Sequence, residues 1–144
     1  MSALTCTRRL EFDAAHRLMQ HEGKCKNLHG HRYVVEASFS ADTLDSVGRV
    51  IDFGVIRERL GAWLDDNWDH TTILYEKDRA LGAAISDKTG QTIFYLPENP
   101  SAENMALYLL NTVCPKLFSD TGLACTSLRL YETPNCFVDV ANPR

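Results

Sequence analysis

The segment His29-Gly-His31, which runs directly into an alternating stretch, constrains the fold more than any other feature of the sequence. From residue 33 to residue 41, apolar or small residues alternate with more polar ones, which is the period of a half-buried β-strand. Side chains two apart on a strand point to the same face, so His29 and His31 can direct both imidazoles to one point. A third histidine, His16, follows another predicted strand. The pattern predicts a metal site built on a sheet.

Three neutral imidazoles leave one position of a tetrahedral zinc ion open, as catalytic rather than structural zinc sites do. We therefore expect His16, His29 and His31 to bind Zn²⁺. Cys25 lies four residues before His29, which suggests thiol chemistry beside the metal. Two alternatives stay open. Cys25 could itself complete a closed Cys-His₃ structural site, and His21 could be a fourth ligand rather than a bystander.

Cys25 would act as a base or nucleophile only as a thiolate, a form that Lys24, Lys26 and a nearby metal all favour. The pair Asp69-His70 offers an imidazole for proton relay, with the carboxylate supporting the ring. The alternative for this pair is the polar, solvent-exposed end of a helix.

Glu132 is the candidate residue for ligand recognition. Its strand neighbours Leu128 and Leu130 are apolar and share its face, which directs the carboxylate toward a pocket. A carboxylate in a pocket needs hydrogen-bond donors. A pterin or guanine ring offers two parallel donors, from its ring N–H and its exocyclic amine. The alternative is a glutamate on the surface at the end of a strand.

Size and composition predict one globular domain over residues 1–144, with 44% hydrophobic and 24% charged residues. The net charge of −4 gives no general attraction to nucleic acid. No stretch approaches the roughly 18 consecutive apolar residues of a membrane span. Five cysteines without a C-x-x-C pair, and the lack of an apolar leader, favour the cytoplasm. Basic residues near the histidines could serve an anionic substrate: Arg17, Lys24, Lys26 and Arg32.

Periodicity and turn signals predict strands over 4–12, 33–41, 126–132 and 137–140, with a loop over 13–30. One helix should follow a cap at Asp52, and another should open at Ser101. Between the helices, 79–86 reads as a short helix and 92–96 as an extended piece. The order β-β-α-α-β-β predicts an α+β fold, in which two helices cover one face of a four-stranded antiparallel sheet. Its open edges favour a ring-like oligomer with continuous sheets.

The chain resembles the 6-pyruvoyl-tetrahydropterin synthase family. The motifs that carry the resemblance occur in the order the family requires: Phe12-x-Ala-Ala-His16-Arg17-Leu18, Cys25-x₃-His29-Gly-His31, Asp69-His70, Pro100-Ser101-x-Glu103-Asn104 and Tyr131-Glu132-Thr133. The resemblance covers nearly the whole chain, and segment 76–98 matches least. It implies the T-fold (tunnelling fold), with subunits assembled into trimers that pair into hexamers and active sites between subunits.

The same resemblance implies a role for each candidate residue. The zinc ligands would be His16, His29 and His31. The proton-transfer set would be Cys25, Asp69 and His70. Glu132 would anchor the pterin ring, with Glu103 and Ser101 near that pocket.

The three residues between Cys25 and His29 resemble the bacterial branch of the family. That branch converts 7,8-dihydroneopterin triphosphate to 6-carboxy-5,6,7,8-tetrahydropterin, acetaldehyde and triphosphate in queuosine (7-deazaguanine) biosynthesis. The alternatives are pyruvoyl-tetrahydropterin synthesis, which stops after triphosphate elimination, and a non-catalytic T-fold that binds zinc and a pterin. The chain departs from the family pattern in the long segment after His70 and in Ala102, where many members carry a second hydroxyl residue.

Overall fold

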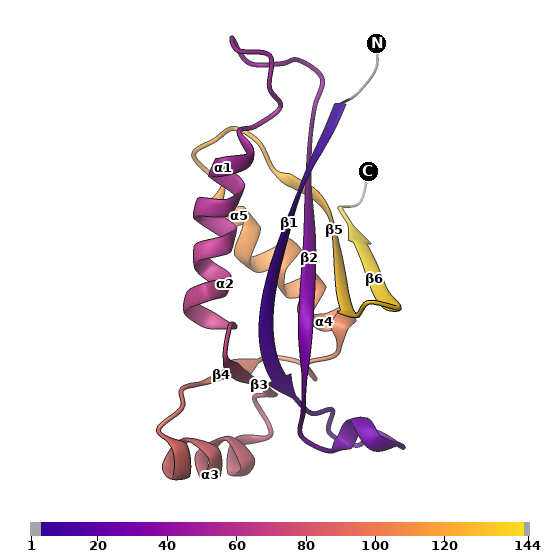
Figure 1. The fold of residues 1–144 in the computed structure, drawn as a ribbon, viewed down its shortest axis with the longest axis vertical. Coiled ribbons are helices and arrows are strands. Elements are labelled where there is room, and N and C mark those ends of the chain that lie inside the picture. The colour runs from indigo at the N-terminus through magenta and orange to yellow at the C-terminus, as the bar shows by residue number, and fades with distance from the viewer. Residues whose placement is uncertain (1–3, 143–144) are drawn as a thin grey trace.

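A six-stranded sheet forms the centre of the computed structural model, which describes residues 4–142. Its strand order is β4-β3-β1-β2-β5-β6. The strands of the two predicted hairpins pair antiparallel in succession: β1 (Leu4–His16), β2 (His29–Ala41), β5 (Cys125–Thr133) and β6 (Cys136–Ala141). In Figure 1, β1 and β2 form a long ribbon that runs most of the length of the molecule.

Two further strands correct the predicted sheet. β3 (Thr71–Tyr75) lies parallel beside the end of β1, and β4 (Ile93–Leu96) lies parallel beside β3. The predicted α+β class is confirmed, but the sheet is mixed and six-stranded rather than antiparallel and four-stranded. The reason is burial, because the middle of β3 is covered on both sides and is apolar apart from Thr72.

Strand β1 is longer than the predicted 4–12. It pairs with β2 without a register shift, from Leu4 opposite Ala41 to His16 opposite His29. The prediction of a loop from residue 13 was therefore wrong for residues 13–16. Ala14 and His16 are buried, and this burial continues the alternation of the strand to its end.

Two long helices cover one face of the sheet, as predicted, and each has a π-helical turn in its middle. The first comprises α1 (Phe53–Ile56), the turn Arg57–Gly61 and α2 (Ala62–Asn67). The second comprises α4 (Ala102–Tyr108), the turn Leu109–Val113 and α5 (Cys114–Leu117).

Both predicted helix caps are confirmed. The Asp52 carboxylate accepts a hydrogen bond from the N–H of Gly54 at 2.8 Å. The Ser101 hydroxyl accepts one from the N–H of Asn104 at 3.1 Å. Each bond satisfies a donor that the first helical turn leaves without a partner in the helix.

The segment between the helices folds as α3 (Arg79–Thr89) followed by β4. The predicted short helix is thus confirmed and extends three residues beyond 86, and the predicted extended piece is β4. Gly90 ends α3 in the left-handed conformation with φ 74°, which glycine adopts without a steric cost. Figure 1 shows α3 at one end of the molecule, next to β3 and β4.

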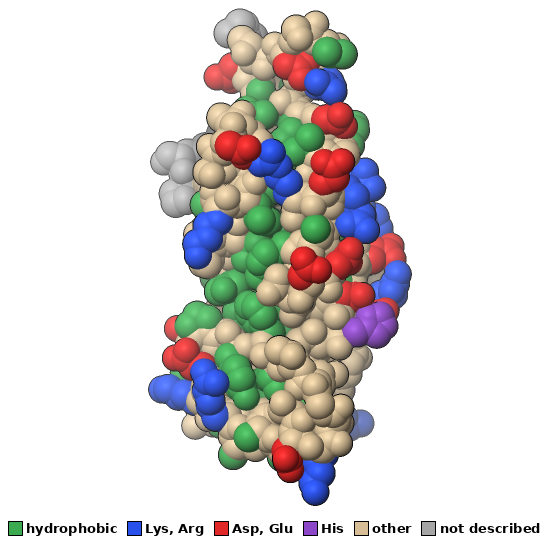
Figure 2. All heavy atoms as spheres, turned by 90° about the vertical axis from the view of Figure 1, so that its left-hand side faces the viewer, with side chains coloured by type: hydrophobic (Ala, Val, Ile, Leu, Met, Phe, Trp, Pro, Cys, Tyr) green, Lys and Arg blue, Asp and Glu red, His purple; other side chains and the backbone are tan. Residues whose placement is uncertain are grey.

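The hydrophobic core lies between the long helices and the sheet. Phe12 stacks on Tyr33 with ring centroids 5.0 Å apart, and the buried Trp68 packs against Phe12 at 5.6 Å. Figure 2 views the helical side and shows hydrophobic side chains along the middle of this face, between charged ones. Among the helices of residues 4–142, none is long and apolar enough to cross a membrane.

Candidate metal centre and its surroundings

Three histidines meet where β1 ends and β2 begins. His16 is the last residue of β1 and lies directly opposite His29, the first residue of β2, while His31 follows two positions along the same face. The nitrogen atoms that each ring could offer to a metal all lie within 4.8 Å of one another. Within the described residues, this is the group of side chains with the composition and spacing of a metal site.

Backbone carbonyls fix the proton positions on two of these rings. Nδ1 of His16 donates to the carbonyl of Pro100 at 2.7 Å, and Nδ1 of His29 donates to the carbonyl of Asn27 at 2.7 Å. A carbonyl only accepts, so each ring carries its proton on Nδ1 and a lone pair on Nε2. Metal-binding histidines are oriented in the same way by outer hydrogen bonds.

The inner ring atoms fit a cation. Nε2 of His16 and Nε2 of His29 are 3.2 Å apart, and with both protons on Nδ1 two lone pairs face each other. A cation between the rings would replace that repulsion with coordination. Nε2 of His31 is buried and has no hydrogen-bond partner among the described residues, although buried polar atoms are nearly always paired. The donor set therefore fits a zinc ion, which binds neutral imidazole nitrogen.

Burial favours the neutral form of two of the three histidines, His16 and His31. His16 is 1% exposed, and burial lowers its pKa to about 4, although the Pro100 carbonyl favours the protonated ring. Burial also lowers the pKa of His31, against the opposing influence of the Glu132 carboxylate. Neutral rings are the form that binds a metal.

Glu132 lies beside the histidine cluster. Its carboxylate oxygens are 3.5 Å from Nε2 of His31 and 3.9 Å from Nε2 of His16. Glu132 and His31 line a cavity of about 600 Å³ on the sheet, together with Arg9, Tyr131 and Pro134 among others. This volume lies in the range of small-molecule sites, and the cavity places a carboxylate next to the candidate metal position.

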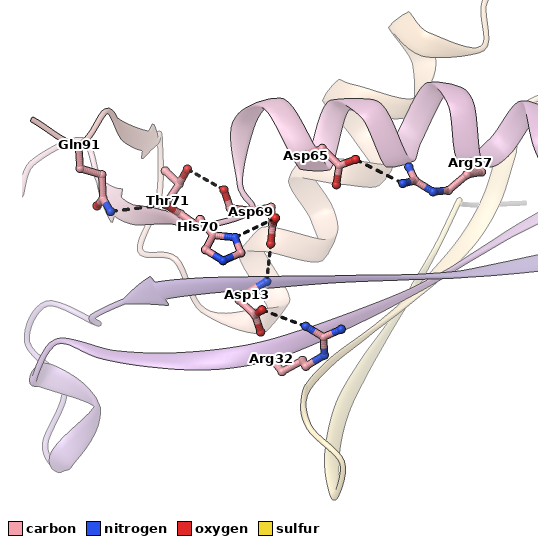
Figure 3. A network of polar contacts seen from close by, with 8 residues as sticks. All are labelled: Asp13, Arg32, Arg57, Asp65, Asp69, His70, Thr71 and Gln91. Carbon is pink, nitrogen blue, oxygen red and sulfur yellow. Dashed lines mark hydrogen bonds and ion pairs between the residues drawn. The ribbon is translucent and has the colours of Figure 1, made fainter.

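Asp69 and His70 contact each other, which their adjacency in sequence did not guarantee. Nδ1 of His70 lies 2.9 Å from Oδ2 of Asp69, and the other Asp69 oxygen accepts from the N–H of Asp13 at 2.9 Å. The N–H of His70 donates to the carbonyl of Asp13 at 2.6 Å. Figure 3 shows the pair against β1, with Arg32 bound to the Asp13 carboxylate at 2.9 Å.

The electrostatics of this pair favour a charged imidazole. The hydrogen bond and charge of Asp69 raise the pKa of His70 above its ordinary value. Burial alone would raise the pKa of Asp69, but hydrogen bonds from Asp13 and His70 lower it overall. The His70 side chain is 79% exposed and lines an open pocket of about 470 Å³ together with His31. The pair is thus placed to exchange protons with a molecule on the sheet surface.

Three predicted site residues lie apart from these cavities within one chain. Cys25 sits in a short 3₁₀ turn (Lys24–Lys26) and is partly exposed. The Ser101 hydroxyl caps α4, and Glu103 is exposed in the first turn of that helix. None of the three is among the residues that line the cavities of His31 and Glu132 or of His70.

Two of the four basic residues noted in the sequence are already paired. Arg17 forms a bidentate ion pair with Asp78, and Arg32 binds Glu11 and Asp13. Their charges are therefore largely compensated within the chain. His21 accepts a hydrogen bond from the N–H of Gly23 at 2.8 Å and lies outside the metal group, as the bystander interpretation expects.

Sequence reasoning missed the groups that orient the site. The carbonyls of Asn27 and Pro100 carry no side-chain signal, so no motif could have revealed them. Asp13 occupies the unspecified position of the Phe12-x-Ala-Ala-His16 motif. Its alternation with the buried Phe12 and Ala14 could have placed it on the open face of the sheet.

The fold and the site define a T-fold protein with a three-histidine centre able to hold a metal ion. The chain belongs to the 6-pyruvoyl tetrahydropterin synthase family, whose sequence profile matches residues 5–143.

Bacterial relatives carry the name of the branch predicted from the sequence. A Rickettsia conorii protein named 6-carboxy-5,6,7,8-tetrahydropterin synthase is 51% identical over 137 residues, covering 95% of this chain and 99% of the relative. A Haemophilus influenzae protein of the same name is 32% identical over 138 residues, covering 92% of this chain and 95% of the relative. The predictions of the family and of an enzyme are confirmed.

Solved structures agree with the predicted T-fold. Caenorhabditis elegans 6-pyruvoyl tetrahydropterin synthase superposes with a TM-score of 0.70 at 22% identity, covering 99% of this chain and 98% of that one. An uncharacterized protein from Wolinella succinogenes superposes with a TM-score of 0.84 at 20% identity, covering 99% of this chain and 100% of that one.

Proposed function

We propose that this chain, acting as one domain over residues 1–144, is a zinc-dependent lyase of queuosine (7-deazaguanine) biosynthesis. It would convert 7,8-dihydroneopterin triphosphate to 6-carboxy-5,6,7,8-tetrahydropterin, acetaldehyde and triphosphate. The observation that carries the proposal is the three-histidine cluster beside Glu132. It occurs in a chain about half identical to bacterial relatives that are named for this product.

Each residue has a defined task in the proposal. Glu132 accepts hydrogen bonds from the ring N–H and the exocyclic amine of the pterin. Cys25, as a thiolate, removes a proton from the substrate side chain, and His70 relays a proton with Asp69 holding its Nδ1. His16, His29 and His31 would hold zinc, which supplies Lewis acidity toward the side-chain oxygens of the substrate. Glu103 and Ser101 complete the pterin pocket.

The proposed enzyme works as a homo-oligomer, a trimer or a dimer of trimers, with each site shared between subunits. The support is that Cys25 and Glu103 do not line the cavity of Glu132 within one chain. In addition, the edge strand β6 is largely exposed and free to pair with another copy. Mixing the inactive variants Cys25→Ala and His70→Ala should then restore part of the activity. A mixture that stays as inactive as each variant alone would contradict shared sites.

The decisive experiment incubates zinc-loaded protein with 7,8-dihydroneopterin triphosphate and identifies the products by mass spectrometry, with an acetaldehyde assay alongside. Carboxytetrahydropterin with acetaldehyde is the expected result. Pyruvoyl-tetrahydropterin without acetaldehyde would show that the reaction ends at triphosphate elimination. Intact substrate, together with unfolding of the protein on chelation, would indicate a binding module held together by structural zinc.

Cysteine variants test the proton-transfer role. Cys25→Ala should lose turnover, while Cys6→Ala is the matched control, because Cys6 is a partly exposed free thiol near the start of β1, at the opposite end of the strand from His16. Full turnover by Cys25→Ala would rule out the thiolate as the base. The cysteines of the described residues are all free, which fits the cytoplasmic location expected from the sequence.

A further inference from the structure

The segment between β1 and β2 carries Cys25, and its conformation is set by a few hydrogen bonds. The N–H of Leu18 donates to the carbonyl of Cys25 at 2.8 Å, so the start of the segment holds the turn that contains the thiol. At the other end, the carbonyl of Asn27 accepts from the His29 ring at 2.7 Å. The position of Cys25 relative to the histidines therefore depends on where residues 18 and 19 are held.

Asn99 holds that point through both halves of its side-chain amide. Its Oδ1 accepts from the N–H of Met19 at 2.9 Å, and its Nδ2 donates to the carbonyl of Met19 at 3.0 Å. An asparagine that satisfies both backbone groups of one residue acts as a one-residue strand partner. It leaves Met19 little freedom to shift.

Asn99 is itself fixed at the start of α4. Its carbonyl accepts from the N–H of Ser101 at 2.8 Å and from the side-chain amide of Asn104 at 2.9 Å. The next residue, Pro100, provides the carbonyl that binds the His16 ring. Residues 99 and 100 thus hold the Cys25 segment and a histidine of the metal cluster from the same piece of backbone.

A second anchor lies beside the first. Arg17 binds Asp78 through two hydrogen bonds, of 2.6 and 2.5 Å, and Asp78 is 3% exposed at the start of α3. Asp78 lies in segment 76–98, which matches the family pattern least, and Asn99 directly follows that segment. The connection between β3 and α4 therefore holds the segment that leaves β1 at two points.

We propose that Asn99 is a positioning residue for Cys25, which sets the place of the thiol relative to the histidine cluster through Met19 and Leu18. This inference rests on the proposed function, in which Cys25 is the base. A misplaced base lowers kcat, because proton transfer needs hydrogen-bond reach in the reacting complex. Substrate affinity depends mainly on Glu132 and the cavity and should change little.

The test compares two variants of Asn99. Asn99→Ala removes both hydrogen bonds to Met19, while Asn99→Asp keeps an oxygen that can accept from the N–H of Met19. Asn142→Ala is the control, because Asn142 also donates its amide to a backbone carbonyl, at 2.9 Å, far from the site. Alkylation of Cys25 by iodoacetamide, located by peptide mass spectrometry, measures the order of the segment without turnover. Zinc content and far-UV circular dichroism report the fold.

We expect Asn99→Ala to be alkylated at Cys25 about tenfold faster, because the loss of both hydrogen bonds to Met19 releases the segment that holds the thiol. We expect kcat to fall between about 10-fold and 100-fold with KM within about threefold, as small displacements of a catalytic group produce. The alkylation rate and the kcat of Asn99→Asp should both lie between those of Asn99→Ala and those of the natural chain. A purely structural loss would not predict this graded order.

Unchanged alkylation and turnover in folded Asn99→Ala would overturn the positioning role, and the proposed function would stand if the natural chain turns over. Faster alkylation in a protein that shows no turnover at all would uphold the role of Asn99 and overturn the proposed reaction. If Asn99→Ala does not fold, Asn99→Asp decides by the same two measurements.

Discussion

The imidazole of His16 donates its Nδ1 hydrogen to the carbonyl of Pro100, which lies 84 residues further along the chain, at 2.7 Å. The bond joins the end of β1 to the residue that precedes the N-cap of α4, so it links the two halves of the fold at the histidine cluster. It also leaves Nε2 of His16 as the free nitrogen, directed at the other two histidines. The orientation of the candidate metal ligand therefore depends on folding of the second helix.

The histidine cluster predicts a large loss of zinc affinity on replacement of one ring. His29→Ala should lower the affinity by at least about 100-fold, the upper end of what loss of an outer hydrogen bond to a ligand costs. His21→Ala is the matched control, since His21 lies in the connection between β1 and β2 but outside the cluster. Competition with a chromophoric zinc chelator measures both constants. Equal affinities would remove His29 from the metal site.

The ion pair between Arg17 and Asp78 predicts an asymmetry between its two partners. Arg17→Met should cost about 3–5 kcal/mol of unfolding free energy, because it leaves a buried carboxylate unpaired. Asp78→Asn should cost only about 1–2 kcal/mol, since the Arg17 side chain is 32% exposed and reaches water. Urea denaturation of the two variants measures the difference.

A surface pair with the same geometry provides the control. Arg129 binds Asp139 through two hydrogen bonds, but both side chains are exposed. Arg129→Met should therefore leave the urea midpoint of unfolding almost unchanged. If Arg17→Met also left the urea midpoint almost unchanged, Asp78 would have to be hydrated in solution.

The Asp69–His70 pair predicts a pH dependence with a definite sign. Asp69 raises the pKa of His70 above 6.5, so the protonated pair stabilises the fold fully below about pH 6.5. That stabilisation is lost as the pH rises through the raised pKa. Asp69→Asn should bring the pKa of His70 down, as an NMR titration of the histidine Cε1–H signals would show. A constant His70 pKa would contradict the contact.

The buried hydroxyl of Tyr33 predicts a substitution without a penalty. Its oxygen is buried and has no hydrogen-bond partner within the described residues, while its ring stacks on Phe12. Tyr33→Phe keeps the ring and removes the unpaired group, so the metal-free protein should be unchanged or more stable by up to about 1 kcal/mol. Phe12→Ala, which removes the stacked partner, should cost about 3–5 kcal/mol. A clear loss in Tyr33→Phe would reveal a bound water on the hydroxyl.

Much of the fold followed from periodicity, because local patterns set the long elements. The alternation over residues 33–41 falls within β2, and the caps at Asp52 and Ser101 mark the starts of both long helices. β3 was missed because it is five residues long and pairs parallel with β1, a strand far away in sequence. Nothing local distinguishes such a segment from a connection, since its partner is decided by tertiary packing.

The site was predictable where strand geometry alone places side chains. His29 and His31 share a face because they are two apart, and His16 meets them because its strand pairs in register with β2. The contacts of Asn99 with Met19 and of Pro100 with His16 join distant parts of the chain through backbone groups. No residue pattern encodes them, so only the structure could show them.

The unbroken pairing of β1 with β2 has an evolutionary consequence. His16 faces His29 because the strands hold them opposite each other, whatever the length of chain that connects them. Insertions and deletions in that connection would leave the histidine cluster intact while they move the thiol. One residue added within either strand would instead turn its histidine to the opposite face. A chain of this fold can therefore change the reach of the segment that carries Cys25 and still keep one histidine cluster.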